Sequence, residues 1–197
     1  MAEGWGSMLL TERLVLRRWR PEDLEPYVEI CADSEVMRWI GKGQVRTREE
    51  CARALASFER AWEGRGFGLF AMELRPARGL IGFVGLSIPD FLPEILPSVE
   101  IGWRLAAAHW GKGLATEGAR AALAFGFGRV GLDRIVGIHQ VGNGASGRIM
   151  EKLGMRLERE TIDPSCARPV RVYEITRSDW QRCVRGVGPR GDERTGS

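Results

Sequence analysis

The chain has 197 residues, of which 44% are hydrophobic and 28% are charged, and its formal net charge at pH 7 is +3. This balance is typical of one globular domain that buries a core without disulfides or metal. The small charge and the scattered arginines give no basic stripe of the kind that binds nucleic acid. There is no 18-residue apolar run and no N-terminal secretion signal. We therefore expect a cytoplasmic protein that binds neither nucleic acid nor membranes.

The cysteines do not indicate a metal site or a disulfide framework. None of the four has the CxxC spacing of a zinc ligand pair, and the chain offers only two histidines, His109 and His139. We expect no bound metal, and buried thiols in a reducing cytosol. The cysteines are Cys31, Cys51, Cys166 and Cys183.

The first half of the chain contains clear signals for helix starts and strands. Pro21, followed by two acidic residues, favours the first turn of a helix. Thr47 and Glu50 form a capping box at the start of another. Two apolar runs joined by a short RPAR turn indicate an antiparallel pair. We expect helices at 21–32 and 48–63 and strands at 13–19, 67–74 and 79–88.

The second half alternates strands with helices after an irregular loop. Three prolines exclude a central strand at 89–97. The tail at 186–197 is polar and rich in glycine, so we expect it to be disordered after a single domain at 8–185. The pattern predicts a mixed α/β sheet. We expect strands at 98–105, 134–140, 155–162 and 170–176, and helices at about 114–129 and 145–153.

The sequence HWGKGLATEG, residues 109–118, is a glycine-rich turn that opens onto a helix, which is typical of a phosphate site. It is not a Walker loop, because Gly113 follows Lys112 where Ser or Thr is required. It also fails the dinucleotide pattern, since Thr116 takes the place of the last glycine. Its backbone N–H groups could still hold a diphosphate.

A second glycine pattern, at Gly142, Gly144 and Gly147, matches the dinucleotide fingerprint, with Asp163 about 20 residues later. The short helix, the late position and the few residues that follow count against a Rossmann unit. The alternative is a pair of strand–turn–helix units, 98–129 and 134–153, whose turns lie at one edge of the sheet.

Three segments together resemble the GNAT superfamily of acetyl-CoA-dependent N-acetyltransferases: VEIGWRL, HWGKGLATEGARAAL and GNGASGRIMEKLGM. The sequence is most similar to the branch of the ribosomal-protein N-terminal acetyltransferases (RimJ/RimL-like), over about residues 10–180. The resemblance implies an α/β (α+β) fold. Its central sheet would be mixed, mostly antiparallel and of six to seven strands, with helices on both faces and splayed strands at the cofactor site.

The same resemblance implies that acetyl-CoA lies between the strands at 98–105 and 134–140. Its pantetheine arm would pair with the main chain near Trp103 and contact Asn143, and its diphosphate would meet the amides of the glycine turn. Trp110 would pack, and a phosphate contact of Lys112 is left open. The residues assigned to the cofactor are Trp103, Arg104, Leu105, Trp110, Gly111, Lys112, Gly113, Leu114, Ala115, Thr116, Asn143, Ser146 and Met150.

For catalysis, the resemblance implies direct attack of an amine on the thioester. Many relatives place a tyrosine where this chain has Met150, and Ser146 is the substitute as proton donor to the thiolate, or else a helix cap. Glu100 is the candidate base, acting through water. Some relatives place the base at the position of Val99, so Glu100 alternatively faces away.

The acceptor is expected to be a primary amine, with a protein N-terminal α-amine favoured because more of it is neutral at pH 7 than of a lysine amine. Trp39, Glu100 and His139 are assigned to the acceptor site, with structural roles as the alternative for each. The rival functions are acetylation of a small molecule (aminoglycoside, polyamine or amino acid) and a non-catalytic acetyl-CoA-binding module. A homodimer is left open.

Overall fold

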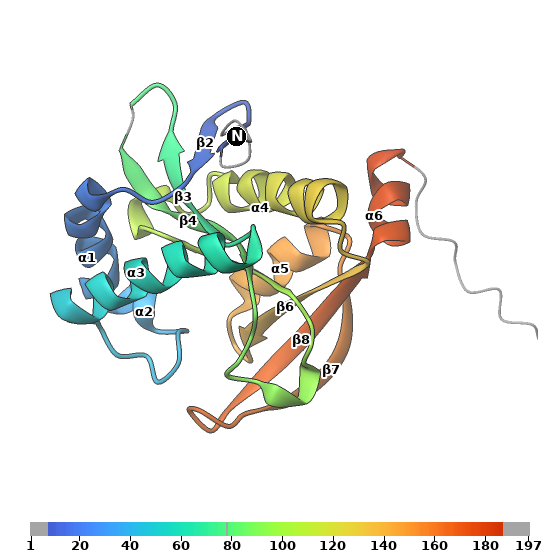
Figure 1. Ribbon diagram of the computed structural model, residues 1–197. Helices are drawn as coiled ribbons and strands as arrows, with labels where there is room; N and C mark the ends of the chain where they lie inside the picture. The colour runs from blue at the N-terminus through green and yellow to red at the C-terminus, as the bar shows by residue number, and fades with distance from the viewer. Residues whose placement is uncertain (1–7, 78, 187–197) are drawn as a thin grey trace, which may run out of the picture.

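The computed structural model describes residues 8–77 and 79–186, which are built around one eight-stranded sheet (Figure 1). The strands are β1 (Met8–Leu10), β2 (Leu14–Arg17), β3 (Leu69–Leu74), β4 (Leu80–Ser87), β5 (Glu100–Leu105), β6 (Arg134–Gln140), β7 (Arg156–Asp163) and β8 (Arg168–Thr176). Their order in the sheet is β1-β2-β3-β4-β5-β6-β8-β7. Only β5 and β6 are parallel neighbours. The mixed, mostly antiparallel sheet is therefore confirmed.

The sheet has one strand more than the upper end of the expected six to seven. The additional strand is β1, which has three residues with two of them exposed, so it has no alternating pattern long enough to detect. It lies at the edge of the sheet and pairs only with β2.

The helices are α1 (Leu24–Ala32), α2 (Ser34–Met37), α3 (Arg48–Arg65), α4 (Leu114–Phe125), α5 (Gly144–Lys152) and α6 (Arg177–Val184). The predicted helix at 21–32 begins with a 3-10 turn, and the one at 114–129 ends in a π turn from Gly126 to Val130. Helices α2 and α6 were not predicted, although Thr176 and Asp179 form a capping box at the start of α6. Of the predicted tail at 186–197, residues 187–197 lie outside the described residues.

Helices cover both faces of the sheet, as predicted (Figure 1). Helix α4 packs on one face against β4 and β5, and α1 packs on the opposite face of β4 beside α3. Small residues let α4 approach closely: a Cβ on Gly118 would lie 3.1 Å from both Met72 and Val84 side chains. Two hydrophobic cores result, one under α4 and one under α1 and α3.

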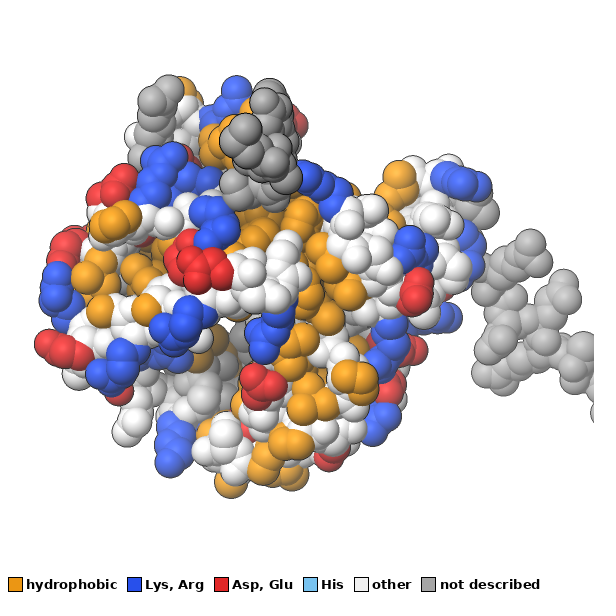
Figure 2. All heavy atoms as spheres, viewed as in Figure 1, with side chains coloured by type: hydrophobic (Ala, Val, Ile, Leu, Met, Phe, Trp, Pro, Cys, Tyr) orange, Lys and Arg blue, Asp and Glu red, His pale blue; other side chains and the backbone are white. Residues whose placement is uncertain are grey.

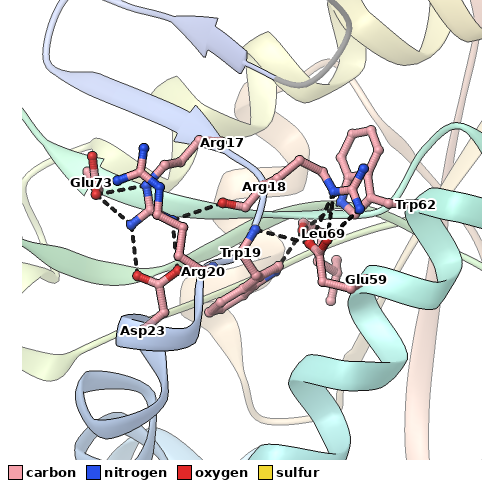
Figure 3. Close-up of polar contacts among 9 residues, drawn as sticks. All are labelled: Arg17, Arg18, Trp19, Arg20, Asp23, Glu59, Trp62, Leu69 and Glu73. Atoms are coloured by element: carbon pink, nitrogen blue, oxygen red, sulfur yellow. Dashed lines mark hydrogen bonds and ion pairs between the residues drawn. The ribbon is translucent and has the colours of Figure 1, made fainter. Parts of the chain in front are cut away.

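Charged residues fix the layer of α1 and α3 onto the sheet (Figure 3). Arg17, at the end of β2, is 5% exposed and donates to both carboxylate oxygens of Asp23 at 2.7 Å. It also donates to Glu73 Oε1 on β3 at 2.8 and 2.5 Å. The neighbouring Arg18 pairs with Glu59 of α3. The buried charge of Arg17 is thus paired, as burial requires, and the end of β2 is tied to the start of α1 and to α3.

The expectation of buried thiols holds for half of the cysteines. Cys31 and Cys51 are fully buried in the core under α1 and α3. Cys166 is half-buried in the turn between β7 and β8, and Cys183 on α6 is exposed, so the expectation is wrong for these two. All four are free thiols.

The parallel strands β5 and β6 separate, as predicted from the resemblance. They pair at Glu100 and Val136 only, where the Val136 N–H donates to the Val99 carbonyl at 2.9 Å. The proline-rich loop 89–97 packs Leu92 and Ile95 against Val136 of β6 and against Val170 and Val172 of β8. From residue 101 onward, one side of β5 has no strand neighbour among the described residues.

Candidate functional site

A cleft of about 860 Å³ opens where β5 and β6 separate. Its wall is formed by the end of β5, the glycine turn, the starts of α4 and α5, the end of β6 and the loop after α2. Every residue that the sequence analysis assigned to the cofactor or the acceptor lies in this wall, apart from Lys112. The two glycine turns do meet at one edge of the sheet.

The glycine turn has the backbone shape of an anion site. Gly111 and Gly113 have φ angles of +71° and +76°, which disfavour any residue with a Cβ. Gly113 is the N-cap of α4 and supplies no side chain to the helix. The first N–H groups of α4, from Leu114 to Thr116, therefore lack intrahelical acceptors at the positive end of the helix dipole. This cradle fits a diphosphate.

Contacts from the beginning of the chain brace this turn. Arg13 Nη1 donates to the Lys112 carbonyl at 2.9 Å, and Arg13 Nε donates to Glu117 Oε2 at 2.7 Å. Thr11 Oγ1 donates to the other oxygen of Glu117 at 2.6 Å. These partners were not predicted from the sequence, because more than 90 residues separate them from the turn.

Basic residues near the glycine turn lie mostly outside the main cleft. The Lys112 ammonium donates to the Ala108 carbonyl at 2.7 Å and is exposed, so the structure places it away from the cleft wall. A second hollow of about 660 Å³ adjoins the turn and includes Arg13, Arg120 and Lys152. Arg120 and Lys152 supply positive charge beside the turn that the glycine motif alone did not indicate, whereas the charge of Arg13 is balanced by Glu117.

At the start of α5, Asn143 is the N-cap, and its Oδ1 accepts a hydrogen bond from the Ser146 N–H at 3.3 Å. The alternative that Ser146 caps this helix is therefore wrong. Ser146 lies in the cleft wall, half-buried, and no partner of its hydroxyl is found among the described residues. Met150, one turn further, is 1% exposed and belongs both to the core and to the cleft wall.

Glu100 faces the cleft and not the core under α4. Val99 is buried in that core, and the alternation of the strand turns Glu100 to the opposite face. Burial raises the pKa of Glu100 to about 8, although a hydrogen bond with Ser87, directly across on β4, favours the charged form. The carboxyl is therefore poised to gain or lose a proton near neutral pH.

The three rings of the predicted site are held by main-chain contacts. Trp39 is half-buried and lies close to Gly142, where a Cβ would come within 2.9 Å of its ring. The Trp110 indole N–H donates to the Leu105 carbonyl at 2.8 Å. His139 is 6% exposed and places Nδ1 2.9 Å from the Gln140 carbonyl. Burial lowers its pKa, which favours the neutral ring.

Two arginine side chains lie at the α1 side of the cleft, and the sequence did not indicate that either would be there. Arg104 is 8% exposed, and its Nη1 lies 3.3 Å from both the Tyr27 hydroxyl and Cys31 Sγ. Its guanidinium lies over the Phe83 ring, 5.2 Å from the centroid. Arg46 lies in the same part of the wall and is half-buried. The sequence analysis considered only the main chain of Arg104.

The charges on the rest of the surface are mixed. Figure 2 shows Lys and Arg side chains interspersed with Asp and Glu side chains on the face in view, with hydrophobic side chains gathered towards its centre. In the described part of the chain, no helix is long and apolar enough to cross a membrane.

The fold, the separated strands and the glycine turn define a class of acyl-transferring enzymes, and comparison with known proteins identifies it. The profile of the acetyltransferase (GNAT) domain matches residues 13–156. The chain belongs to the GNAT family of N-acetyltransferases and is an acyltransferase. Members of this family use acetyl-CoA.

Individual relatives agree with this assignment. The uncharacterized N-acetyltransferase YnaD of Bacillus subtilis (strain 168) is 33% identical over 150 residues, covering 76% of this chain and 83% of the relative. A GNAT-family acetyltransferase structure from Bacillus anthracis is 28% identical, with a TM-score of 0.72, and the match covers 87% of this chain and 99% of that one. Spermidine N-acetyltransferase from Vibrio cholerae, crystallised with CoA and spermine, shares the fold at 20% identity and a TM-score of 0.70, with 87% and 99% covered.

Proposed function

We propose that this enzyme transfers acetyl from acetyl-CoA to an α-amine, foremost that of a protein N-terminus, as in the RimJ/RimL-like branch. The observation that carries the proposal is the half-buried Glu100, which faces the cleft and whose pKa, raised to about 8, is close to the 7.7–8.0 of an α-amine. Because these two pKa values are nearly equal, the equilibrium constant for proton transfer from such an ammonium to Glu100 is close to one. Transfer from a lysine ammonium, with a pKa of about 10.4, would be uphill by a factor of several hundred.

In this proposal, different residues of the chain assist different steps of a direct acetyl transfer. Acetyl-CoA supplies a thioester carbonyl that a neutral amine can attack. The Glu100 carboxylate takes the proton that the amine loses, directly or through one water. The Ser146 hydroxyl donates a hydrogen bond or a proton to the sulfur that leaves as a thiolate. The main chain near Trp103 stabilises the oxygen on which negative charge develops.

The same proposal assigns the cofactor's parts to the two turns. The amides from Gly111 to Thr116 would hold the diphosphate, because their N–H groups have no acceptor in the helix. The open side of β5 from Trp103 to Leu105 and the Asn143 amide would hold the pantetheine arm. Trp110 would pack beside it, with its indole already bonded to the main chain.

The rival acceptor is a small-molecule amine, and spermidine is the substrate of one structural neighbour. A polyamine carries several positive charges, and Arg46 and Arg104 would repel them at the α1 side of the cleft. This favours an acceptor without extra positive charge. Two further expectations from the sequence, a single domain at 8–185 and a possible homodimer, remain predictions.

Thiol release from acetyl-CoA, measured with amino acids, polyamines, aminoglycosides and N-terminal peptides, tests the proposal. We expect kcat/KM to be highest for peptides, with mass spectrometry placing the acetyl group on the α-amine. The matched variant Glu160→Gln, an exposed carboxylate of β7 outside the cleft, should behave like the parent. A polyamine or aminoglycoside that outperforms every peptide would refute the N-terminal assignment.

A further inference from the structure

Arg104 is a buried cation with no anionic partner among the described residues. It is 8% exposed, and no carboxylate forms an ion pair with it; its contacts are the Tyr27 hydroxyl, Cys31 and the Phe83 ring. Its Nε is buried and has no hydrogen-bond partner in that part of the chain. Buried arginines in proteins are ordinarily paired, as Arg17 is in this chain.

The groups around Arg104 do not provide the missing charge. Burial raises the pKa of Tyr27, so that its hydroxyl stays neutral. Burial also raises the pKa of Cys51, which lies in the same core, to about 11. The guanidinium therefore keeps a full positive charge in the cleft wall.

A second cation lies in the same region. Arg46 is half-buried in the cleft wall, and its charge acts on both Tyr27 and Cys51, as that of Arg104 does. No described residue forms an ion pair or a side-chain hydrogen bond with Arg46. Its main-chain N–H donates to the Cys31 carbonyl at 3.1 Å, which fixes this part of the loop against α1.

Among the described residues, no carboxylate of the cleft wall forms an ion pair with Arg104 or Arg46, and Glu35 on α2 is exposed. Asp163 accepts hydrogen bonds from Ser165 and Cys166, and Glu50 accepts from the main chain of Thr47 in the capping box of α3. Glu100 is four residues from Arg104 on the same strand face, so their Cα atoms are about 13 Å apart. The two arginines thus form a site for an anion that enters the cleft.

We propose that Arg104 and Arg46 bind a carboxylate of the amine acceptor, while Glu100 receives the amine. This inference rests on the proposed function and narrows its substrate class. The spacing along β5 calls for a carboxylate on the order of 10 Å from the amine, which excludes a free α-amino acid, whose two groups are adjacent. In an extended peptide, an acidic side chain at the third or fourth position meets this distance.

The test compares acceptors that differ only in charge. Tetrapeptide amides with Asp at the second, third or fourth position are measured against their Asn counterparts, and an ω-aminoalkanoate of matching length against its amide. For the parent enzyme we expect kcat/KM at least about tenfold higher for Asp at the third or fourth position. In Arg104→Gln this preference should vanish, in Arg104→Lys it should be reduced, and in Arg60→Gln, an exposed residue of α3 outside the cleft, it should persist.

Arg46→Gln is the second variant and should lower the preference even if Arg104→Gln does not fold. Peptides acetylated with no Asp preference at any position overturn this inference and leave the proposed function standing. A preference for the ω-aminoalkanoate over its amide, without peptide turnover, supports the inference and refutes the N-terminal acceptor. If Arg104→Gln keeps the preference but loses acetyl-CoA affinity by calorimetry, the arginine binds a cofactor phosphate, which overturns the inference. Turnover of no probe overturns both.

Discussion

The two ends of the cleft are built from different parts of the chain. The end at the glycine turn is made of main chain, with Gly111 and Gly113 in left-handed conformations and free N–H groups at the start of α4. The other end, which extends along β5 from Arg104 to Glu100, is made of side chains: these two residues and Arg46 from the loop before α3. A site built from main-chain N–H groups needs glycines at fixed spacing, so it can be recognised as a motif in the sequence. A site built from side chains of distant segments has no such motif. In the proposed function, the main-chain end holds the cofactor and the side-chain end holds the acceptor.

The largest effect should come from Glu100→Gln, which disables the side-chain end. Loss of a general base lowers rates by about 100- to 10,000-fold, and we expect kcat/KM to fall within that range. The parent rate should rise with pH up to about 8, as the Glu100 carboxyl ionises, and the variant should lack this rise. Acetyl-CoA affinity should stay unchanged by calorimetry. A variant that matches the parent at every pH from about 6 to 9 would remove Glu100 from the mechanism.

Protonation of Glu100 should also make the stability of the folded protein depend on pH. The pKa of Glu100 is raised by folding from about 4.5 to about 8, so the folded state binds the proton more tightly than the unfolded state. Its stabilising contribution is full below about pH 4.5 and is lost as pH rises through about 8. Between these limits, Tm should fall more in the parent than in Glu100→Gln. Parallel Tm curves would show that the carboxyl titrates normally.

Gly113→Asp should disable the main-chain end. A carboxylate would stand where the amides face phosphate, so acetyl-CoA affinity should fall by at least about 100-fold, the value of one to two charged hydrogen bonds. The φ of +76° also makes any side chain strained at this position. Gly131→Asp is the matched control, because Gly131 has a φ of +83° and no atom within 4 Å of a new Cβ. If both variants lose affinity equally in calorimetry, backbone strain and not phosphate repulsion is responsible.

The same contrast explains what could be predicted from the sequence. Seven strands, four of the helices and the glycine turn follow from local patterns, so they were predictable. The orientation of Glu100 remained open, because it depends on which face of β5 meets α4. The brace of the turn by Arg13 and the pair of free arginines depend on contacts between distant segments. A single sequence contains no signal for such contacts.

Ser146→Ala tests whether the start of α5 contributes chemistry as well as binding. A hydroxyl that assists the leaving thiolate acts only as charge develops, so kcat should fall by roughly ten- to a thousand-fold with acetyl-CoA affinity nearly constant. Because Asn143 caps the helix, Tm should barely change. Unchanged kcat in single-turnover measurements would mean that the thiolate leaves through water.

The smallest effect should come from substitution of Asn143. At this position a side chain supports the main chain of a turn, so the two kinds of site are combined. The Asn143 Oδ1 caps α5 by accepting from the Ser146 N–H at 3.3 Å, which leaves the amide N–H groups to donate to the pantetheine arm. Asn143→Ala removes both functions. It should cost about 1 kcal/mol of stability as a lost cap, and about 1–3 kcal/mol of acetyl-CoA affinity.

Asn143→Asp separates the two functions. Aspartate keeps an oxygen that can accept the Ser146 N–H, and its charge suits a helix N-terminus, so Tm should equal or exceed that of the parent. It cannot donate, so acetyl-CoA affinity should fall about as far as in Asn143→Ala. If calorimetry instead shows parent affinity in Asn143→Asp and reduced affinity only in the alanine variant, Asn143 acts on the cofactor through the cap. The main chain of α5, held in place by that cap, would then be what contacts the pantetheine arm.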